Sequence, residues 1–334
     1  MPVARCLPRQ RLTGSPRRTP PSAPAQHRVS APSASPTPSS ATTPPTPLPI
    51  VILPGLGNAS SDYASLAAAL LARGAPAVAV APVARPDWLR NAAGLLRKEY
   101  WSGDLTPAPT TDWYLERIEA AVAQARAAAG MEGGKVAVIA HSAGGWLART
   151  WMLGGGAASV ASLTTLGSPH APPPPGCGLP DQTRGILTWV DANTPGAFHG
   201  EVLYTTVAGR YLQGAPLLGG SDGATIAARL AGAGYQALCG ESDCWGDAIT
   251  PVATAHLAGA RQVTLEGVFH GPLGATPDPE GGEEVSAGKK ARFWYGSAPV
   301  IDAWAPGALG LAPLGGRLLV GEVPTSPASR VNAK

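Results

Sequence analysis

Acidic residues are absent from the first 61 residues of this 334-residue chain. The whole chain has 25 basic and 22 acidic residues and a net charge of +3, but six of its arginines lie within residues 1–50. Without that segment, 19 basic residues stand against 22 acidic ones, a balance of −3. Because the chain also lacks a basic patch with interleaved aromatic residues, the sequence does not predict a nucleic-acid partner.

Long apolar runs are missing as well, because glycine, proline and serine interrupt the longest uncharged stretches. The sequence therefore predicts no transmembrane span. Residues 1–47 lack the apolar core of a secretory signal and are rich in arginine, serine, threonine and proline. We expect a disordered transit peptide, directed to the chloroplast because of its proline and serine content, with the mitochondrion as the alternative. A disordered tail without a targeting function is the simpler interpretation.

Cysteine is scarce, with four residues in the chain, of which Cys6 falls in the predicted transit peptide. Cys239 and Cys244 have a C-x4-C spacing but no second pair of ligands, so no zinc site is predicted. The sequence predicts no metal and no cofactor of any other kind. We expect reduced cysteines, and a disulfide to Cys177 is the alternative.

The residues that are present suffice for one large α/β domain, since 44% are hydrophobic and 14% are charged. Short apolar stretches predict strands, and segments with apolar residues at helical spacing follow most of them. This alternation predicts a mostly parallel, doubly wound sheet with helices on both faces. The predicted strands are 48–53, 77–83, 136–139, 159–166, 201–208 and 261–265, and the predicted helices are 62–73, 112–130, 146–152, 185–190, 248–258 and 293–304.

We expect the domain to span residues 48–306, with a poorly ordered tail at 307–334. Three segments depart from the alternation, at about 85–110, 171–198 and 209–245. We expect these insertions to build a cap above the carboxyl edge of the sheet. Four tryptophans are expected to pack in the core or the cap and not to bind substrate, namely Trp88, Trp101, Trp146 and Trp245.

One short stretch combines a strand, a sharp turn and a helix. The apolar strand Val136–Ile139 leads to Ser142, and small residues, Ala140 and Gly144, lie two positions to either side of the serine. This is the pattern of a nucleophile elbow, usually G-x-S-x-G, in which the strained serine requires small neighbours. Alanine at the first position still meets that requirement. The five residues alone leave open a serine at an ordinary strand-to-helix turn.

The segment P-G-L-G-N (54–58) follows the first predicted strand, where α/β sheets place their ligands. A glycine-flanked loop beside a nucleophile can present a backbone N–H to an oxyanion. We assign that role to Leu56, with the N–H of Ala143 as the second donor. An ordinary turn is the alternative, and a phosphate loop is not expected because no Gly-Lys-Ser/Thr follows.

A serine hydroxyl needs an imidazole to take its proton and a carboxylate to orient that imidazole. His270 follows the last predicted strand, and Asp247 lies 23 residues before it in G-D-A-I-T-P-V. The chain order Ser142, Asp247, His270 is that of α/β-hydrolases, so we assign these residues as nucleophile, acid and base. One departure is that Asp247 lies about 39 residues beyond the strand at 201–208, and not in a short loop.

Other residues compete for these roles. His256 is the second choice as the base, whereas His141 is expected to shape the pocket and His170 to be structural. Asp222 and Asp243 are the other candidates for the acid.

Taken together, these motifs resemble the lipase-type α/β-hydrolases, over about residues 48–305. The chain is particularly like the plastid-targeted lipase-like hydrolases of plants and algae. This resemblance implies the α/β-hydrolase fold and an acyl-enzyme mechanism on carboxylic esters. The motifs that carry it are L-P-G-L-G (53–57), A-H-S-A-G-G (140–145), L-G-S-P-H (166–170), G-D-A-I-T-P-V (246–252) and L-E-G-V-F-H (265–270).

We therefore expect a serine esterase or lipase that acts on a small-molecule ester with a hydrophobic acyl group, such as a lipid. Peripheral contact with a membrane surface would accompany such a substrate. A thioesterase, an amidase, an acyltransferase or a binding protein without turnover are the alternatives on the same scaffold.

Overall fold

The computed structural model of this protein describes residues 47–174, 177, 181–219, 223–276, 291–311 and 322–323. The predicted transit peptide, apart from residue 47, lies outside the described residues. So do Asp222 and most of the predicted tail at 307–334.

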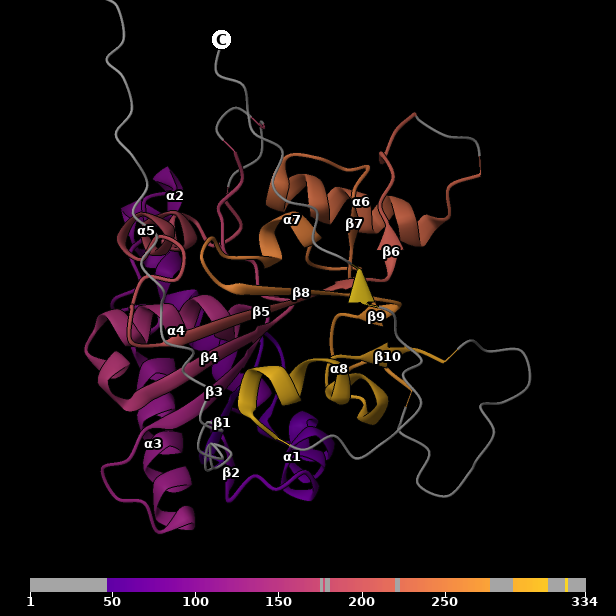
Figure 1. The fold of residues 1–334 in the computed structure, drawn as a ribbon. Coiled ribbons are helices and arrows are strands. Elements are labelled where there is room, and N and C mark those ends of the chain that lie inside the picture. The colour runs from indigo at the N-terminus through magenta and orange to yellow at the C-terminus, as the bar shows by residue number, and fades with distance from the viewer. Residues whose placement is uncertain are drawn as a thin grey trace, which may run out of the picture. The chain divides into compact units, whose positions relative to one another are not determined.

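A seven-stranded sheet forms the centre of the domain, with the strand order β11-β8-β5-β4-β3-β1-β2 (Figure 1). Neighbouring strands are parallel except for β11, which pairs antiparallel with β8. This topology confirms the predicted α/β-hydrolase fold. The strands are β1 Ile50–Leu53, β2 Val78–Val80, β3 Val136–His141, β4 Val160–Leu166, β5 Leu203–Arg210, β8 Arg261–Glu266 and β11 Glu322–Val323.

Successive residues of the central strands face two separate cores. In β1, Val51 and Leu53 pack into one core, whereas Ile50 and Ile52 pack into the other, on the opposite face of the sheet. Each such side chain contributes about 1.5–3 kcal/mol when it is fully buried. Burial on both faces explains why these strands are continuously apolar and do not alternate with polar residues.

Helices cover both faces of the sheet (Figure 1). The first core contains residues of α3 Asp112–Ala129, α4 Ala143–Leu153 and α5 Ile186–Asn193. The second core contains residues of α1 Ala64–Ala72 and α8 Ala298–Leu309. The sheet is therefore doubly wound, as the sequence predicted.

The insertions have their own secondary structure. Residues 85–110 contain the 3-10 helix Arg85–Leu96 and the short helix α2 Lys98–Ser102. Residues 209–245 contain α6 Ile226–Cys239, and β6 Leu212–Gln213 pairs antiparallel with β7 Trp245–Gly246. In the part of the chain that the structure describes, no helix is both long and apolar enough to span a membrane.

The predicted helix at 248–258 is wrong in its length, because α7 covers only Val252–Ala255. Ala248 has a φ of +86°, and the N–H groups of Ile249 and Thr250 donate to the Asp247 side chain. Because these two N–H groups bind the carboxylate, they make no helical hydrogen bonds, and the helix begins only at Val252.

The predicted helix at 293–304 is displaced. Phe293–Trp294 forms β10, which pairs with β9 Val268–Phe269, and α8 begins only at Ala298 with a proline in its first turn. The helix then continues to Leu309, past the predicted domain end at 306, and Glu322–Val323 adds the strand β11. The remaining predicted strands and helices occur where expected, to within a few residues.

Candidate active site

Ser142 lies between β3 and α4, at the turn that the sequence predicted. Its φ is +52° and its ψ is −125°, a conformation that costs a non-glycine residue free energy and persists only where the surroundings hold it. The surroundings are tight, because a Cβ added at Gly144 would lie 2.7 Å from the carbonyl oxygen of Leu53. Ala140 is fully buried and its methyl group is accommodated, so glycine is required on the helix side of the serine only.

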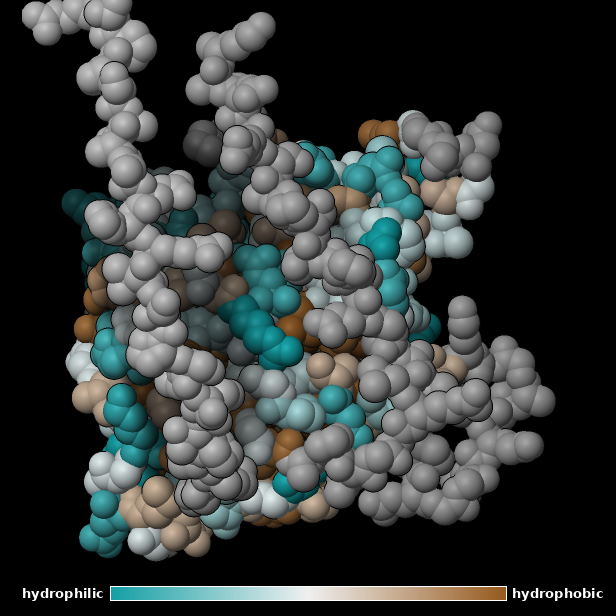
Figure 2. Space-filling model, viewed as in Figure 1, coloured by the Kyte–Doolittle hydropathy of each residue, from teal (hydrophilic) through white to brown (hydrophobic). Residues whose placement is uncertain are grey.

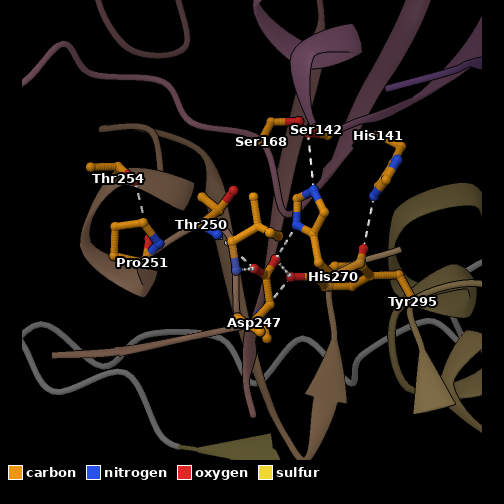
Figure 3. Close-up of polar contacts among 12 residues, drawn as sticks. His141, Ser142, Ser168, Asp247, Thr250, Pro251, Thr254, His270 and Tyr295 are labelled. Carbon is orange, nitrogen blue, oxygen red and sulfur yellow. Dashed lines mark hydrogen bonds and ion pairs between the residues drawn. The ribbon is translucent and has the colours of Figure 1, made fainter. Parts of the chain in front are cut away.

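Three side chains from separate loops meet at this turn (Figure 3). The Ser142 Oγ lies 3.0 Å from Nε2 of His270, and Nδ1 of His270 lies 2.8 Å from Oδ2 of Asp247. A carboxylate only accepts hydrogen bonds, so Nδ1 carries a proton, and Nε2 of the neutral ring accepts from the serine. The structure thus brings together the residues predicted as nucleophile, base and acid.

Asp247 is fully buried, and all the groups around its carboxylate donate to it. Oδ1 accepts the N–H groups of Ile249 at 3.0 Å and Thr250 at 2.7 Å. Oδ2 accepts from His270 and from the hydroxyl of Tyr295, the latter at 2.8 Å. Four donors around two oxygens stabilise the ionised form and fix the orientation of the carboxylate.

The other candidate residues lie elsewhere. His256 is hydrogen-bonded to Thr206 and Thr264, and burial lowers its pKa to about 4, so it stays neutral and is not the base of this site. Asp243 bonds to Gln213 at the surface and has no contact with His270. Asp222 lies outside the described residues.

His170 is fully buried against Arg149 and Thr165, and burial holds its pKa well below the usual range. Its two ring nitrogens both face polar side chains within the fold. This arrangement agrees with the structural role that the sequence indicated.

His141 has a different place from the one predicted, since it does not line the pocket described below. Its Nε2 lies 2.8 Å from the carbonyl oxygen of His270, which only accepts, so Nε2 carries the proton. Its Nδ1 accepts from the hydroxyl of Tyr63 at 2.7 Å. Burial and the neighbouring His270 lower the pKa of His141 to about 3, so the ring stays neutral and ties the two segments together.

The same network holds the loop at residues 54–58. The Tyr63 oxygen accepts the N–H of Gly55 at 2.9 Å, and the carbonyl of Pro54 accepts the hydroxyl of Tyr114 at 2.6 Å. Within the described residues, no hydrogen bond occupies the backbone N–H of Leu56 or of Ala143. Both residues line one pocket, and Ala143 begins α4, whose N-terminus favours negative charge. These two N–H groups are thus available to an oxyanion.

A pocket of about 160 Å³ adjoins Leu56 and Ala143. Its walls come from residues 88–114, from α4 and from residues 182–186, whereas the described part of 209–245 contributes nothing to it. The insertion at 85–110 therefore contributes to the pocket wall, as does the one at 171–198, and the described part of 209–245 does not. The lining residues are Leu56, Trp88, Asn91, Tyr100, Leu105, Thr110, Thr111, Trp113, Tyr114, Ala143, Trp146, Leu147, Gln182, Thr183, Arg184 and Ile186.

Five of the sixteen lining residues are aromatic. Trp88 packs edge-on to Trp113 and tilted against Tyr114, with ring centres 5.3 Å apart in both pairs. Trp88 and Trp146 are nearly buried and belong to the first core, which agrees with the expected packing role, and both also line the pocket. Among the described residues of the lining, Arg184 alone is charged, and its guanidinium lies over the Tyr100 ring.

No protein-family model matches the sequence. No curated protein matches it either. Among solved structures, the chain is similar to the mature form of the Bacillus licheniformis lipase BlEst2, with 19% identity and a TM-score of 0.40 over 65% of this chain and 82% of that one.

Two further solved structures show the same kind of distant likeness. A pyrethroid hydrolase from Sphingobium faniae has 22% identity and a TM-score of 0.23, over 37% of this chain and 41% of that one. RedJ with a bound polyethylene glycol molecule has 21% identity and a TM-score of 0.24, over 55% of this chain and 76% of that one. Likenesses at this level carry no information about substrate, so the chemistry follows from the site alone.

Sequence reasoning missed two residues of the site, Tyr63 and Tyr295. Tyr63 ends the 3-10 helix Ser60–Tyr63, directly before α1, and its oxygen accepts the N–H of Gly55 in the 54–58 loop. Tyr295 precedes α8, and its hydroxyl donates to Asp247. Neither tyrosine belongs to a motif, and their roles depend on tertiary contacts that no spacing reveals. In the described part of the chain, no group of three or more His, Cys, Asp or Glu side chains is arranged to hold a metal ion.

Proposed function

We propose that this protein is a serine hydrolase that cleaves carboxylic esters with a hydrophobic acyl group, through an acyl-enzyme on Ser142. The observation that carries the proposal is the hydrogen-bonded series from Ser142 through His270 to Asp247, placed beside an apolar pocket and two available N–H groups. A structural serine would not need this strained turn, an imidazole at 3.0 Å and a fully buried carboxylate behind it.

The geometry supports a two-step reaction. As the Ser142 Oγ attacks the ester carbonyl, its proton passes to Nε2 of His270, and Asp247 stabilises the resulting imidazolium. The developing oxyanion accepts the N–H groups of Leu56 and Ala143. His270 then gives the proton to the departing alcohol, and water, activated by the same nitrogen, releases the acid and restores the serine.

The pocket supports an apolar acyl group of moderate size. Its volume of about 160 Å³ is close to that of an apolar cavity of roughly 150 Å³ that holds one benzene molecule. The surrounding aromatic rings offer dispersion contacts and few hydrogen-bond partners. We therefore place the acyl chain of the ester in this pocket, next to the oxyanion donors, and leave the alcohol portion facing outward.

The outer surface of the pocket wall supports contact with an aggregated or membrane-bound ester. On the face shown in Figure 2, hydrophobic residues form small patches separated by hydrophilic ones. On the segment that walls the pocket, Leu89, Leu96 and Trp101 expose 75%, 91% and 71% of their surface. We expect these exposed apolar side chains to contact the apolar surface of such an ester.

A fluorophosphonate probe and an ester panel test the proposed function. We expect the probe to modify Ser142 alone, as located by peptide mass spectrometry, and 4-nitrophenyl esters of medium chain length to be cleaved faster than the acetate. Turnover should rise further when the ester exceeds its solubility limit. Absence of a probe adduct would exclude a serine hydrolase, and faster cleavage of a thioester or an amide than of the matched ester would replace esters as the substrate class.

We propose also that residues 1–47 direct the protein to a plastid. The support is their composition, which is free of acids and rich in proline, serine and arginine. A fusion of residues 1–50 to a fluorescent protein should enter plastids in a plant or algal cell. Fluorescence in mitochondria would change the destination, and fluorescence throughout the cytosol would overturn the transit function.

A further inference from the structure

Tyr295 lies beneath the proposed catalytic acid in a space that two glycines keep open. The tyrosine is fully buried, and its hydroxyl reaches Oδ2 of Asp247 at 2.8 Å. A Cβ added at Gly167 would lie 2.5 Å from Oδ2 of Asp247 and 2.8 Å from the Tyr295 ring, and one added at Gly209 would lie 3.0 Å from the Tyr295 oxygen. Glycine at the ends of two neighbouring strands thus permits the close approach of phenol and carboxylate.

The direction of each hydrogen bond around the phenol is fixed. The backbone N–H of Gly209 donates to the Tyr295 oxygen at 2.7 Å, so the phenolic proton is left for Asp247. Burial and the adjacent carboxylate raise the pKa of Tyr295 well above its usual range, so the phenol keeps its proton. Oδ2 of Asp247 therefore accepts two hydrogen bonds, one from this phenol and one from His270.

We propose that Tyr295 is a positioning residue for the proposed hydrolysis. Its hydroxyl holds Oδ2 of Asp247, the oxygen that orients His270, and lowers the negative charge on that oxygen. The proposal rests on the proposed function, in which His270 is the base. A phenol that donates to the carboxylate withdraws charge from Oδ2, and an imidazolium beside that oxygen is stabilised less. Tyr295 thereby sets how readily His270 becomes protonated.

Removal of the hydroxyl has two expected consequences. In Tyr295→Phe, kcat falls by about tenfold because the carboxylate loses one charge-assisted hydrogen bond and with it part of its fixed orientation. The acid limb of the kcat/KM profile moves to higher pH, by about half a unit or more, because Oδ2 then stabilises the protonated imidazole more strongly. KM changes little, since Tyr295 does not line the pocket.

In the part of the chain that the structure describes, few titratable groups face Asp247 and His270. His141 packs on His270 and stays neutral, with its pKa lowered to about 3, and Tyr235 also faces Asp247 with a pKa raised by burial. Neither changes its charge between pH 5 and 9. A displacement of the acid limb in that range therefore reports on His270 and its carboxylate.

Tyr235→Phe is the matched control. Tyr235 is also fully buried and also bridges two groups, donating to the carbonyl of Leu212 at 3.1 Å and accepting the N–H of Ala248 at 2.9 Å. It lies beside the acid loop, but its hydroxyl makes no hydrogen bond with the carboxylate among the described residues. Tyr235→Phe should lower the melting temperature as Tyr295→Phe does, and leave the pH profile in place.

The experiment measures kcat, KM and the pH profile of the full chain and both variants with one 4-nitrophenyl ester. Site-specific 3-fluorotyrosine at position 295 is a stronger donor of nearly the same shape and should move the acid limb to lower pH. Unchanged profiles for Tyr295→Phe and for the fluorinated protein, or an equal displacement in Tyr235→Phe, would overturn the proposal. If the wild-type protein cleaves none of the esters, the proposed function fails, and an NMR titration of His270 in the same proteins still decides whether Tyr295 sets its protonation.

Discussion

Replacement of Ser142 by alanine is expected to remove ester hydrolysis and labelling by a fluorophosphonate together. Turnover should fall by roughly 10⁴-fold or more, because His270 and Asp247 then have no nucleophile to activate. The residual rate would come from the pocket and the two N–H donors at Leu56 and Ala143. The melting temperature should stay near that of the wild-type protein, because alanine at φ +52° carries the same backbone strain as serine.

Ser168→Ala is the matched control for this experiment. Ser168 is fully buried beside the same turn, and its hydroxyl donates to the carbonyl of Ala140 at 3.3 Å, which is a long hydrogen bond. It contacts neither His270 nor Asp247 through a hydrogen bond in the described structure. Its replacement should leave labelling and turnover largely intact. Equal losses in both variants, or substantial turnover by Ser142→Ala, would mean that the nucleophile is elsewhere.

The features predicted from the sequence are those that a local pattern specifies. Continuous apolar runs marked the buried parallel strands because both of their faces are covered, and the small residues around Ser142 marked the elbow because the turn leaves no space there. The proposed acid, Asp247, was assigned from chain order and from the apolar segment after it, despite its distance from β5. Its contacts with His270 then follow from the way in which the carboxyl ends of parallel strands converge.

The features that escaped prediction depend on contacts between distant segments. The helix expected from 248 is cut short because two of its N–H groups bind the Asp247 carboxylate, a competition that helical periodicity does not show. His141 joins the backbone of His270 to Tyr63, across more than a hundred residues of sequence. The cap was assigned to three insertions alike, and composition alone could not tell that residues of 85–110 and 171–198 line the pocket whereas the described part of 209–245 does not.

Asp247→Asn is expected to lower turnover by about 10⁴-fold while the fold remains intact. The loss of turnover has a specific structural cause, because the four hydrogen-bond partners of the carboxylate are all donors. Asparagine has one acceptor oxygen and one NH₂ group, so it can satisfy the N–H groups of Ile249 and Thr250 or the pair formed by His270 and Tyr295, but not both.

The two backbone donors hold the oxygen of the asparagine in the Oδ1 position, since a buried N–H without an acceptor is costly. The NH₂ group then faces His270 and can only donate, so Nδ1 must become the acceptor and the ring proton moves to Nε2. A proton on Nε2 points at the Ser142 Oγ and prevents the imidazole from taking the serine proton.

Asp243→Asn, measured alongside, removes a carboxylate whose one hydrogen bond among the described residues is to Gln213 at the surface, and should keep near-normal turnover. Asp222→Asn tests the third candidate, which lies outside the described residues. The measurement is turnover of one 4-nitrophenyl ester by each variant, with thermal melting to show that each is folded. Full activity of Asp247→Asn at neutral pH, with collapse of either other variant, would place the acid elsewhere in the chain.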